Sequence, residues 1–267
     1  MIVRLQGGVG NQMFQYAFGR SVSKARNEEL FFEKRSDMVD GVSRFPYSLD
    51  AFKTNVTFAA DVGGHPQYEE RIFAYDEMVY TAPANPHFSG YWQTEKYYFE
   101  PKIIHEELSL RDAVSEQTQR VADEILATSN SAFVHVRRGD YLLPDIAPWI
   151  GNLTLDYYKK AIECIRERMS DVTFFIFSDD PDWCRQNFQG CRVIDHNKGG
   201  RAHEDLFLMS ICKQAVIANS SFSWWGAWLG DFRGKVVISP YRWFADIRHI
   251  KWDPAQSDIT PTRWIRI

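Results

Sequence analysis

Residues 133–141, FVHVRRGDY, join an apolar run to two arginines, a glycine and an aspartate. The run is typical of a buried strand, and the charged residues fall where it ends. From here to residue 239 apolar strands alternate with amphipathic helices. Strands are expected at 132–136, 172–178, 192–195, 215–219 and 235–239, and helices at 154–169, 180–188, 203–213 and 221–230. This alternation predicts a doubly wound α/β domain, a parallel sheet covered on both faces.

The part of the chain before this region is less regular. A strand over residues 1–5 and a helix over 11–27 are expected on either side of a glycine cluster, and a further amphipathic helix over 114–129. Residues 28–101 are rich in aromatics and turn formers, which indicates loops that shape a surface. We therefore expect two compact domains, residues 1–125 and 126–267.

The overall composition excludes some classes of partner. A net charge of −4 with 25% charged residues lacks the basic excess of a nucleic-acid binder. Arg4 and the glycines interrupt the first residues before a signal peptide or anchor could form, and no apolar run is long enough to span a membrane. The four cysteines contain no CxxC pair, which favours reduced thiols in a cytoplasmic protein. Peripheral membrane association and the oligomeric state stay open.

The end of the strand at 132–136 is the first candidate site. Two guanidiniums, Arg137 and Arg138, with His135 before them, suit a phosphate or diphosphate held without a metal. Ligands in doubly wound domains bind at the carboxyl ends of the strands, where these residues lie. The alternative is an ion pair between Arg137 and Asp140 that only closes a loop.

A glycine stretch near the amino terminus is a second candidate. Gly8 and Gly10 lie between a strand and a helix, where free backbone N–H groups favour an anion. The spacing is not that of a dinucleotide fingerprint or of a P-loop, because Met13 stands where a third glycine would be required. Asn11 either caps the helix or faces the ligand, and the two roles are compatible.

Two further strand ends carry small or acidic residues. Asp179 and Asp180 could bind a base or ribose hydroxyl, although one of them is expected to cap the following helix. Asp180 and Asp182 also form a DxD pair, a pattern that in some enzymes holds a divalent ion. Ser220 and Ser221 precede a helix and offer hydroxyls and free amides to an anion.

Four ordered motifs resemble those of the family 11 glycosyltransferases, the α-1,2-fucosyltransferases. They are GGVGNQMFQYA at 7–17, HVRRGDY at 135–141, FSDD at 177–180 and NSSFSWWGAWL at 219–229. The segment GYWQTEKYY at 90–98 is similar to the middle of the family, so the resemblance runs from residue 6 to about residue 230.

The resemblance implies a GT-B-like fold of two Rossmann-type domains facing a cleft, with a carboxyl-terminal GDP-fucose-binding domain and an amino-terminal acceptor-side domain. It also implies inverting, metal-independent transfer of L-fucose from GDP-fucose to the 2-hydroxyl of a galactose-terminated glycan, with no cofactor. The residues it assigns to the donor are His135, Arg137, Arg138, Asp179, Asp180, Ser220, Ser221 and Phe222, and it places Asn11 at the reacting centre. Gly8 and Gly10 are expected to bind the donor through their free backbone N–H groups.

The catalytic base is the least defined part of this hypothesis. Asp140 is the nearest candidate, but it could instead orient an arginine, and the second role is favoured. Two other functions stay open: a different nucleotide-sugar transferase with a metal on Asp180 and Asp182, and a nucleotide- or glycan-binding module without catalysis. The sequence does not identify the natural acceptor glycan.

Overall fold

The protein was examined as a computed structural model, which describes residues 1–34, 45–232, 234–245 and 257–267. The chain divides into two compact units: Met1–Asp112 with Ala255–Pro261, and Ala113–Pro254 with Thr262–Ile267. The expected boundary at residue 125 falls inside helix α3 (Glu116–Ala127). This helix belongs to the second unit, where it packs on α7 (Ala202–Ile211) and where Ser115 Oγ donates a 2.7 Å hydrogen bond to Glu204.

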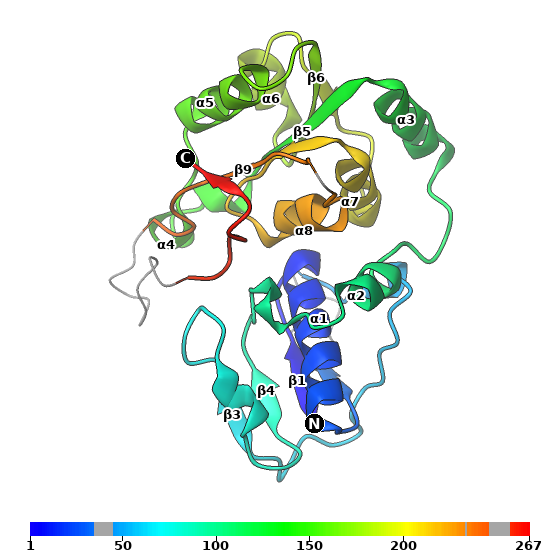
Figure 1. The fold of residues 1–267 in the computed structure, drawn as a ribbon, viewed down its shortest axis with the longest axis vertical. Coiled ribbons are helices and arrows are strands. Elements are labelled where there is room, and N and C mark those ends of the chain that lie inside the picture. The colour runs from blue at the N-terminus through cyan, green and yellow to red at the C-terminus, as the bar shows by residue number, and fades with distance from the viewer. Residues whose placement is uncertain (35–44, 233, 246–256) are drawn as a thin grey trace. The chain divides into compact units, whose positions relative to one another are not determined.

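The first unit contains a parallel sheet in the order β2-β1-β4-β3. Its strands are β1 (Ile2–Leu5), β2 (Phe31–Lys34), β3 (Gln67–Glu69) and β4 (His87–Ser89). Helix α1 (Val9–Arg26) packs along β1, as Figure 1 shows in blue. Residues 28–101 were expected to be loops, which is wrong in part, because they supply β2, β3 and β4.

Several aromatic residues of this region form a core together with Phe18 of α1, whereas Phe99 remains exposed. Phe18, Phe88, Trp92 and Tyr97 are at most 1% exposed, and the rings of Phe18 and Trp92 stack with their centroids 4.2 Å apart. Full burial of a large side chain contributes roughly 1.5 to 3 kcal/mol, so these rings compensate for strands that are too short to be stable alone. Short elements carry the chain between the strands. These are the 3-10 helices η2 (Leu49–Ala51), η3 (Glu77–Tyr80) and η4 (Glu95–Tyr97), and the helix α2 (Pro101–Glu107).

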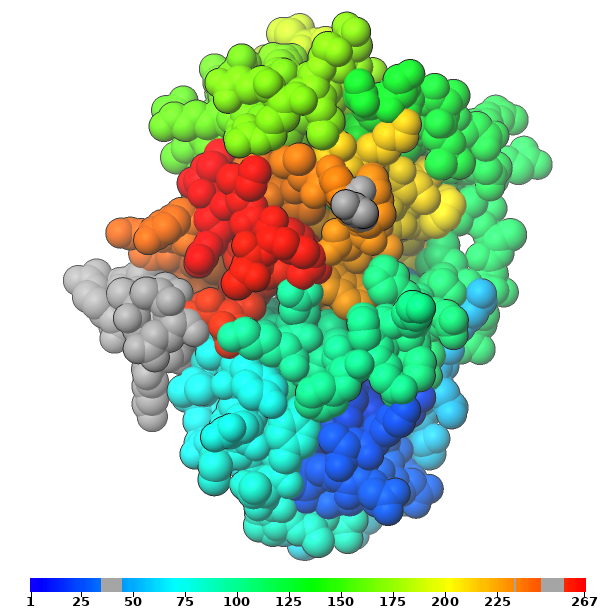
Figure 2. All heavy atoms as spheres, viewed as in Figure 1, coloured from blue at the N-terminus to red at the C-terminus, as the bar shows by residue number. Residues whose placement is uncertain are grey.

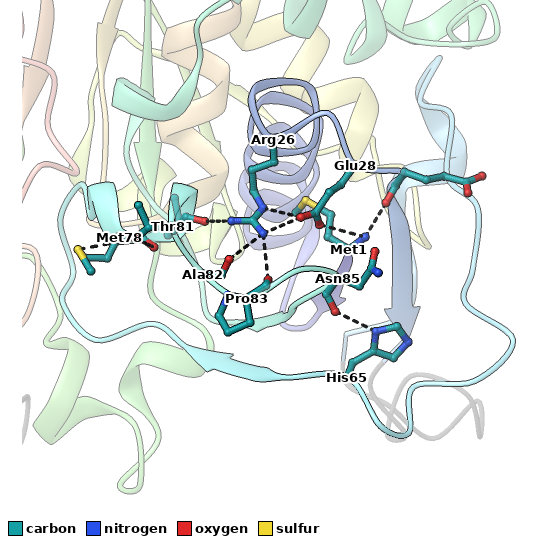
Figure 3. Close-up of polar contacts among 11 residues, drawn as sticks. Met1, Arg26, Glu28, His65, Met78, Thr81, Ala82, Pro83 and Asn85 are labelled. Carbon is teal, nitrogen blue, oxygen red and sulfur yellow. Dashed lines mark hydrogen bonds and ion pairs between the residues drawn. The ribbon is translucent and has the colours of Figure 1, made fainter.

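Hydrogen bonds and an ion pair of Arg26 stabilise the region at the amino-terminal ends of the strands in this unit. Figure 3 shows the Arg26 guanidinium, at the end of α1, donating to the carbonyls of Val79, Ala82 and Pro83 and pairing with Glu28 at 2.6 Å. These bonds satisfy backbone carbonyl oxygens that lie outside the strands and make no hydrogen bonds within the sheet.

The second unit contains a parallel sheet in the order β10-β9-β8-β5-β6-β7. Its strands are β5 (Asn130–Val136), β6 (Val172–Ser178), β7 (Arg192–Ile194), β8 (Gln214–Val216), β9 (Val237–Ser239) and β10 (Ile265–Arg266). Besides α3 and α7, its helices are η5 (Asp140–Leu142), α4 (Ala147–Ile150), α5 (Leu155–Arg166), α6 (Pro181–Asn187) and α8 (Ser221–Leu229). The predicted doubly wound domain is confirmed.

The last strand comes from the carboxyl terminus. Ile267 N donates to Ser239 O and Tyr241 N donates to Ile267 O, so β10 is tied to β9. Figure 2 shows these terminal residues in red, at the surface of their unit. The cysteines are free thiols, with Cys184 and Cys212 buried. Within the described ranges, no helix is both long enough and apolar enough to cross a bilayer.

Candidate functional site

The site in the second unit lies where the winding of the sheet reverses. From β5 the chain builds β6 and β7 on one side, and then returns to place β8, β9 and β10 on the other. A ligand crevice forms at such a switch point, outside the carboxyl ends of the two central strands. Those ends carry His135 near the end of β5, with Arg137 and Arg138 directly after the strand, and Asn219 to Ser221 after β8.

Arg137 is held by two carboxylates at the end of β5. Its Nη2 lies 2.6 Å from Asp140 Oδ1 and its Nη1 lies 3.1 Å from Asp179 Oδ2. The Asp140 side chain is 8% exposed, whereas that of Arg137 is 29% exposed. Because a guanidinium has five N–H donors, two ion pairs leave others for a ligand. The ion pair expected between Arg137 and Asp140 exists, and it orients a cation that is still accessible.

Arg138 has a different environment. Its Nε donates to Asp180 Oδ2 at 3.0 Å, and its guanidinium carbon lies 4.1 Å from the ring centroid of Trp183. A cation over an indole ring is a favourable contact. Arg138 therefore fixes the start of α6 to the loop after β5. Of the two arginine side chains, that of Arg137 is the more exposed.

The two aspartates after β6 make different contacts and have different structural roles. Asp180 is the N-cap of α6, its Oδ1 accepting from Trp183 N at 3.2 Å. Asp179 Oδ1 accepts from Arg138 N at 2.9 Å, and a Cβ on Gly139 would lie 2.7 Å from Asp179 Oδ2. Asp179 thus fixes the loop after β5, and residue 139 must be glycine for the carboxylate to sit there. The sequence predicted one cap of the two without saying which.

His135 points toward α8 and is 4% exposed. Its ring centroid lies 5.5 Å from that of Phe222, and its Nδ1 has no hydrogen-bond partner in the described part of the chain. Burial, aided by the charge of Arg137, lowers the pKa of His135 to about 3. The imidazole is therefore neutral near pH 7, with one buried polar atom unsatisfied.

The start of α8 presents backbone donors beside this histidine. Ser220 is the N-cap and makes no side-chain cap bond, and the first-turn amides have no intrahelical acceptor. The Tyr141 hydroxyl donates to Asn219 O at 3.0 Å, and the Arg137 guanidinium lies 5.5 Å from the Tyr141 ring centroid. The loop after β5 and the start of α8 are thus joined through Tyr141.

Asn219 is a residue of this site that the sequence reasoning missed. Its Nδ2 donates to Ile150 O at 3.0 Å and to Trp243 O at 3.1 Å, so it ties two loops to the end of β8. It directly precedes the serines, and its position within NSSFSW was the available signal.

The DxD pair does not converge on one point. Asp180 caps α6 and pairs with Arg138, whereas the Asp182 side chain is 85% exposed and pairs with Arg185 at 2.7 Å. Over the described ranges, no three His, Cys, Asp or Glu side chains are grouped as a metal site.

The glycine cluster lies in the first unit, at the start of α1. Gly7 adopts a φ of 73°, Gly8 is the N-cap, and Gly10 is buried in the first turn. Asn11 is the third helical residue and its Oδ1 accepts from Gln93 Nε2 at 2.7 Å, so the interpretation of Asn11 as the cap is wrong. The helix begins two residues earlier than expected because the glycines leave its first turn unobstructed.

Two buried glutamines in α1 were also missed. Gln12 Nε2 donates to Gly7 O and Pro46 O, both at 2.9 Å, and Gln15 Oε1 accepts from Gln6 N at 2.9 Å. Both are completely buried. They hold the glycine turn and the loop at Pro46 in place, a tertiary role that spacing does not reveal.

Comparisons with known proteins identify the family of this chain. The model of glycosyl transferase family 11 matches residues 68–267. An α-1,2-colitosyltransferase from Escherichia coli is 31% identical over 100% of this chain and 98% of its own. Galactoside 2-α-L-fucosyltransferase Sec1 from Mus musculus is 27% identical over 85% of this chain and 63% of its own.

A likeness also appears among solved structures. Fucosyltransferase NodZ from Bradyrhizobium has a TM-score of 0.56 at 16% identity, covering 84% of this chain and 91% of its own. A structure of NodZ α-1,6-fucosyltransferase crystallised with GDP has a TM-score of 0.54. At this identity the likeness concerns the fold, which is GT-B.

Proposed function

Because this chain belongs to glycosyl transferase family 11, we propose that it transfers L-fucose from GDP-fucose to the 2-hydroxyl of a terminal β-galactoside, with inversion and without a metal. The names of its relatives support the donor sugar, the linkage and the acceptor. GDP in a protein of the same fold supports the nucleotide.

One observation carries the proposal: Arg137 lies at the switch point, held by two carboxylates, directly after β5, the strand next to β8, which leads into α8. A diphosphate can accept hydrogen bonds from the remaining guanidinium N–H groups and from the free amides of Ser221 and Phe222. Both sets of donors belong to the second unit, whose described elements are a single sheet and the helices that pack on it.

In the proposed reaction, the acceptor hydroxyl attacks C1 of the sugar as the bond from C1 to the diphosphate oxygen breaks. Positive charge develops on the sugar ring and negative charge on the departing GDP. Arg137 and the α8 amides stabilise that negative charge, and their fixed positions avoid a reorganisation cost during the reaction.

The remaining donor contacts follow from burial and polarity. The unsatisfied Nδ1 of His135 and the ring of Phe222 suit one face of the nucleotide, and the hydroxyls of Ser220 and Ser221 suit the phosphates. Asp179 and Asp180 act indirectly here, through the loop and the helix that they fix.

A second donor is supported by a specific finding, the colitosyltransferase relative that aligns with the whole chain. Colitose is L-fucose without its 3-hydroxyl. A site that hydrogen-bonds a hydroxyl discriminates strongly against a substrate that lacks it, whereas an apolar site discriminates weakly. The ratio of kcat/KM for the two GDP-sugars therefore identifies the natural donor.

The decisive test incubates purified protein with GDP-fucose, GDP-colitose or a UDP-sugar, together with a β-galactoside, and determines the product linkage by NMR. We expect an α-1,2-linked product from a GDP-sugar, formed equally well with and without EDTA. A product linked elsewhere would refute the linkage, and loss of turnover in EDTA that Mn²⁺ restores would favour the metal-dependent alternative.

A further inference from the structure

The backbone pairing between β5 and β8 ends before either strand reaches the donors described above. The register between the two strands ends at Val134 and Val216, whereas β5 stays paired with β6 as far as Val136. Arg137 follows the end of β5, and the first-turn amides of α8 come after the end of β8. The distance between these two sets of donors is therefore set by contacts beyond the last paired residues.

Tyr141 connects the two sides from the loop after β5. It is the middle residue of η5, and its hydroxyl donates to Asn219 O at 3.0 Å. Asn219 directly precedes Ser220, the N-cap of α8. This hydrogen bond thus ties the loop that carries Arg137 to the chain that leads into α8.

The same tyrosine contacts Arg137 itself. The guanidinium carbon lies 5.5 Å from the centroid of the Tyr141 ring, within the range of a cation–π contact. Asp140, the preceding residue in η5, pairs with Arg137 Nη2 at 2.6 Å. Two adjacent residues of one short helix therefore hold the guanidinium, and one of them also holds the chain before α8.

The Tyr141 phenol is a neutral hydrogen-bond donor near pH 7. Burial raises its pKa to about 12, and the charge of Arg137 and a side-chain hydrogen bond with Ser220 oppose the shift. A protonated phenol has one O–H to donate, and Asn219 O accepts it. The connection between Tyr141 and Asn219 therefore does not titrate near neutral pH.

On the premise of the proposed function, we propose that Tyr141 is a positioning residue, which sets the spacing between Arg137 and the first-turn amides of α8 so that one diphosphate binds both. A diphosphate has two phosphate groups, one for each set of donors, whereas a monophosphate engages a single set. Tyr141 thereby makes the site selective for a nucleoside diphosphate over the corresponding monophosphate. It acts through Arg137 and α8 and makes no bond to the reacting atoms.

The test compares the affinities for GDP and GMP, measured by calorimetric titration, in the wild type and in the variants Y141F and Y157F. Tyr157, in α5, is the matched control, because its hydroxyl donates to Ile217 O at 2.6 Å, two residues before Asn219. Each variant loses one bond from a phenol to a backbone carbonyl in the same short segment. The ring that contacts Arg137 is that of Tyr141.

The ratio of the two dissociation constants distinguishes positioning from a general loss of order, which would weaken the binding of both nucleotides in parallel. We expect Y141F to bind GDP about fivefold more weakly than the wild type does, the effect of one lost hydrogen bond, and to bind GMP within about 1.5-fold of wild type. Its kcat/KM for transfer from the GDP-sugar should fall by about the same factor of five. Y157F should lose a similar amount of thermal stability and keep the wild-type ratio.

Each outcome bears on the inference. A folded Y141F whose ratio stays within about twofold of wild type, or a Y157F whose ratio falls equally, overturns it. If Y141F does not fold, hydrogen exchange of the wild type decides. GDP should protect the backbone amides of both 137–143 and 219–225, and GMP those of one segment, so equal protection by the two nucleotides overturns the inference. A wild type that neither binds GDP nor uses a GDP-sugar refutes the proposed function itself, whereas an active wild type beside a Y141F with an unchanged ratio refutes only the role of Tyr141.

Discussion

Arg137→Lys is the most informative single change in the donor site. It keeps the positive charge but replaces a planar fork with one ammonium nitrogen. In the structure two different nitrogens, Nη2 and Nη1, meet Asp140 and Asp179 at 2.6 and 3.1 Å. A lysine cannot reproduce both contacts and still direct a donor at the diphosphate.

The size of the effect follows from the donors lost. Removing one preorganised donor to a developing negative charge costs about 2.7 to 4 kcal/mol, or roughly 100- to 1,000-fold in rate. We therefore expect kcat/KM for GDP-sugar to fall at least about 100-fold in Arg137→Lys. Stability should change little, because partly exposed ion pairs contribute about 0 to 1 kcal/mol.

The assay measures initial rates of transfer over a range of donor concentrations, with thermal unfolding to verify the fold. Arg185→Lys is the matched control, since Arg185 also bridges two aspartates, Asp182 and Asp195, but lies on the surface of α6. The control should retain wild-type activity. A folded Arg137→Lys protein with near-normal turnover would remove Arg137 from the mechanism.

The remaining predictions concern the neighbouring groups. Asp140→Asn should weaken GDP binding and turnover together, by about tenfold in a calorimetric titration, because it removes the charged partner of Arg137; intact GDP affinity without transfer would contradict this. Asp180→Ala should lower the free energy of unfolding by about 1 kcal/mol through loss of the cap, and Asp179→Ala should mainly raise the donor KM; equal effects on both quantities would show the division to be wrong. In the folded protein the pKa of His135 is lowered to about 3. Below about pH 6.5 this histidine is therefore protonated in the unfolded chain but stays neutral in the folded protein, so the free energy of unfolding falls on acidification. Urea unfolding at pH 7 and pH 5 should show His135→Gln losing less stability than wild type, and an equal loss would place the proton uptake elsewhere.

The second unit could be predicted from sequence because its elements are long and regular. The strand expected at 172–178 is β6 to the residue, and the helix expected at 203–213 is observed at Ala202–Ile211. A seven-residue strand with five apolar residues, or a ten-residue helix rich in apolar residues, gives a pattern that stands out from its polar flanks. The strand ends followed from the same pattern, which is why Arg137 and Ser220 were found.

The first unit was harder to predict because its structure depends on contacts between residues that are far apart in the sequence. Strands of three residues, such as β3 and β4, are too short for a period, and their stability comes from Phe88 and Trp92 packing across the chain. Gln12 and Gln15 stand in an ordinary helical stretch, and only their hydrogen bonds to Gly7, Pro46 and Gln6 distinguish them from other polar residues. Likewise, nothing local says which of two adjacent aspartates caps α6.

The ion pair of Asp140 argues against its acting as the base. A group that orients Arg137 must remain charged while the negative charge on the diphosphate grows, whereas a base must become neutral in every turnover. Asp140, 2.6 Å from Arg137, would lose its ion pair by taking a proton at the moment when Arg137 is most needed. Because Asp140 then acts only through Arg137, the effects of D140N and Arg137→Lys are not independent, and the double variant should be no worse in kcat/KM than the poorer single variant. A double variant that shows the product of the two losses would mean that the two residues serve separate steps, and the orienting role of Asp140 would have to be abandoned.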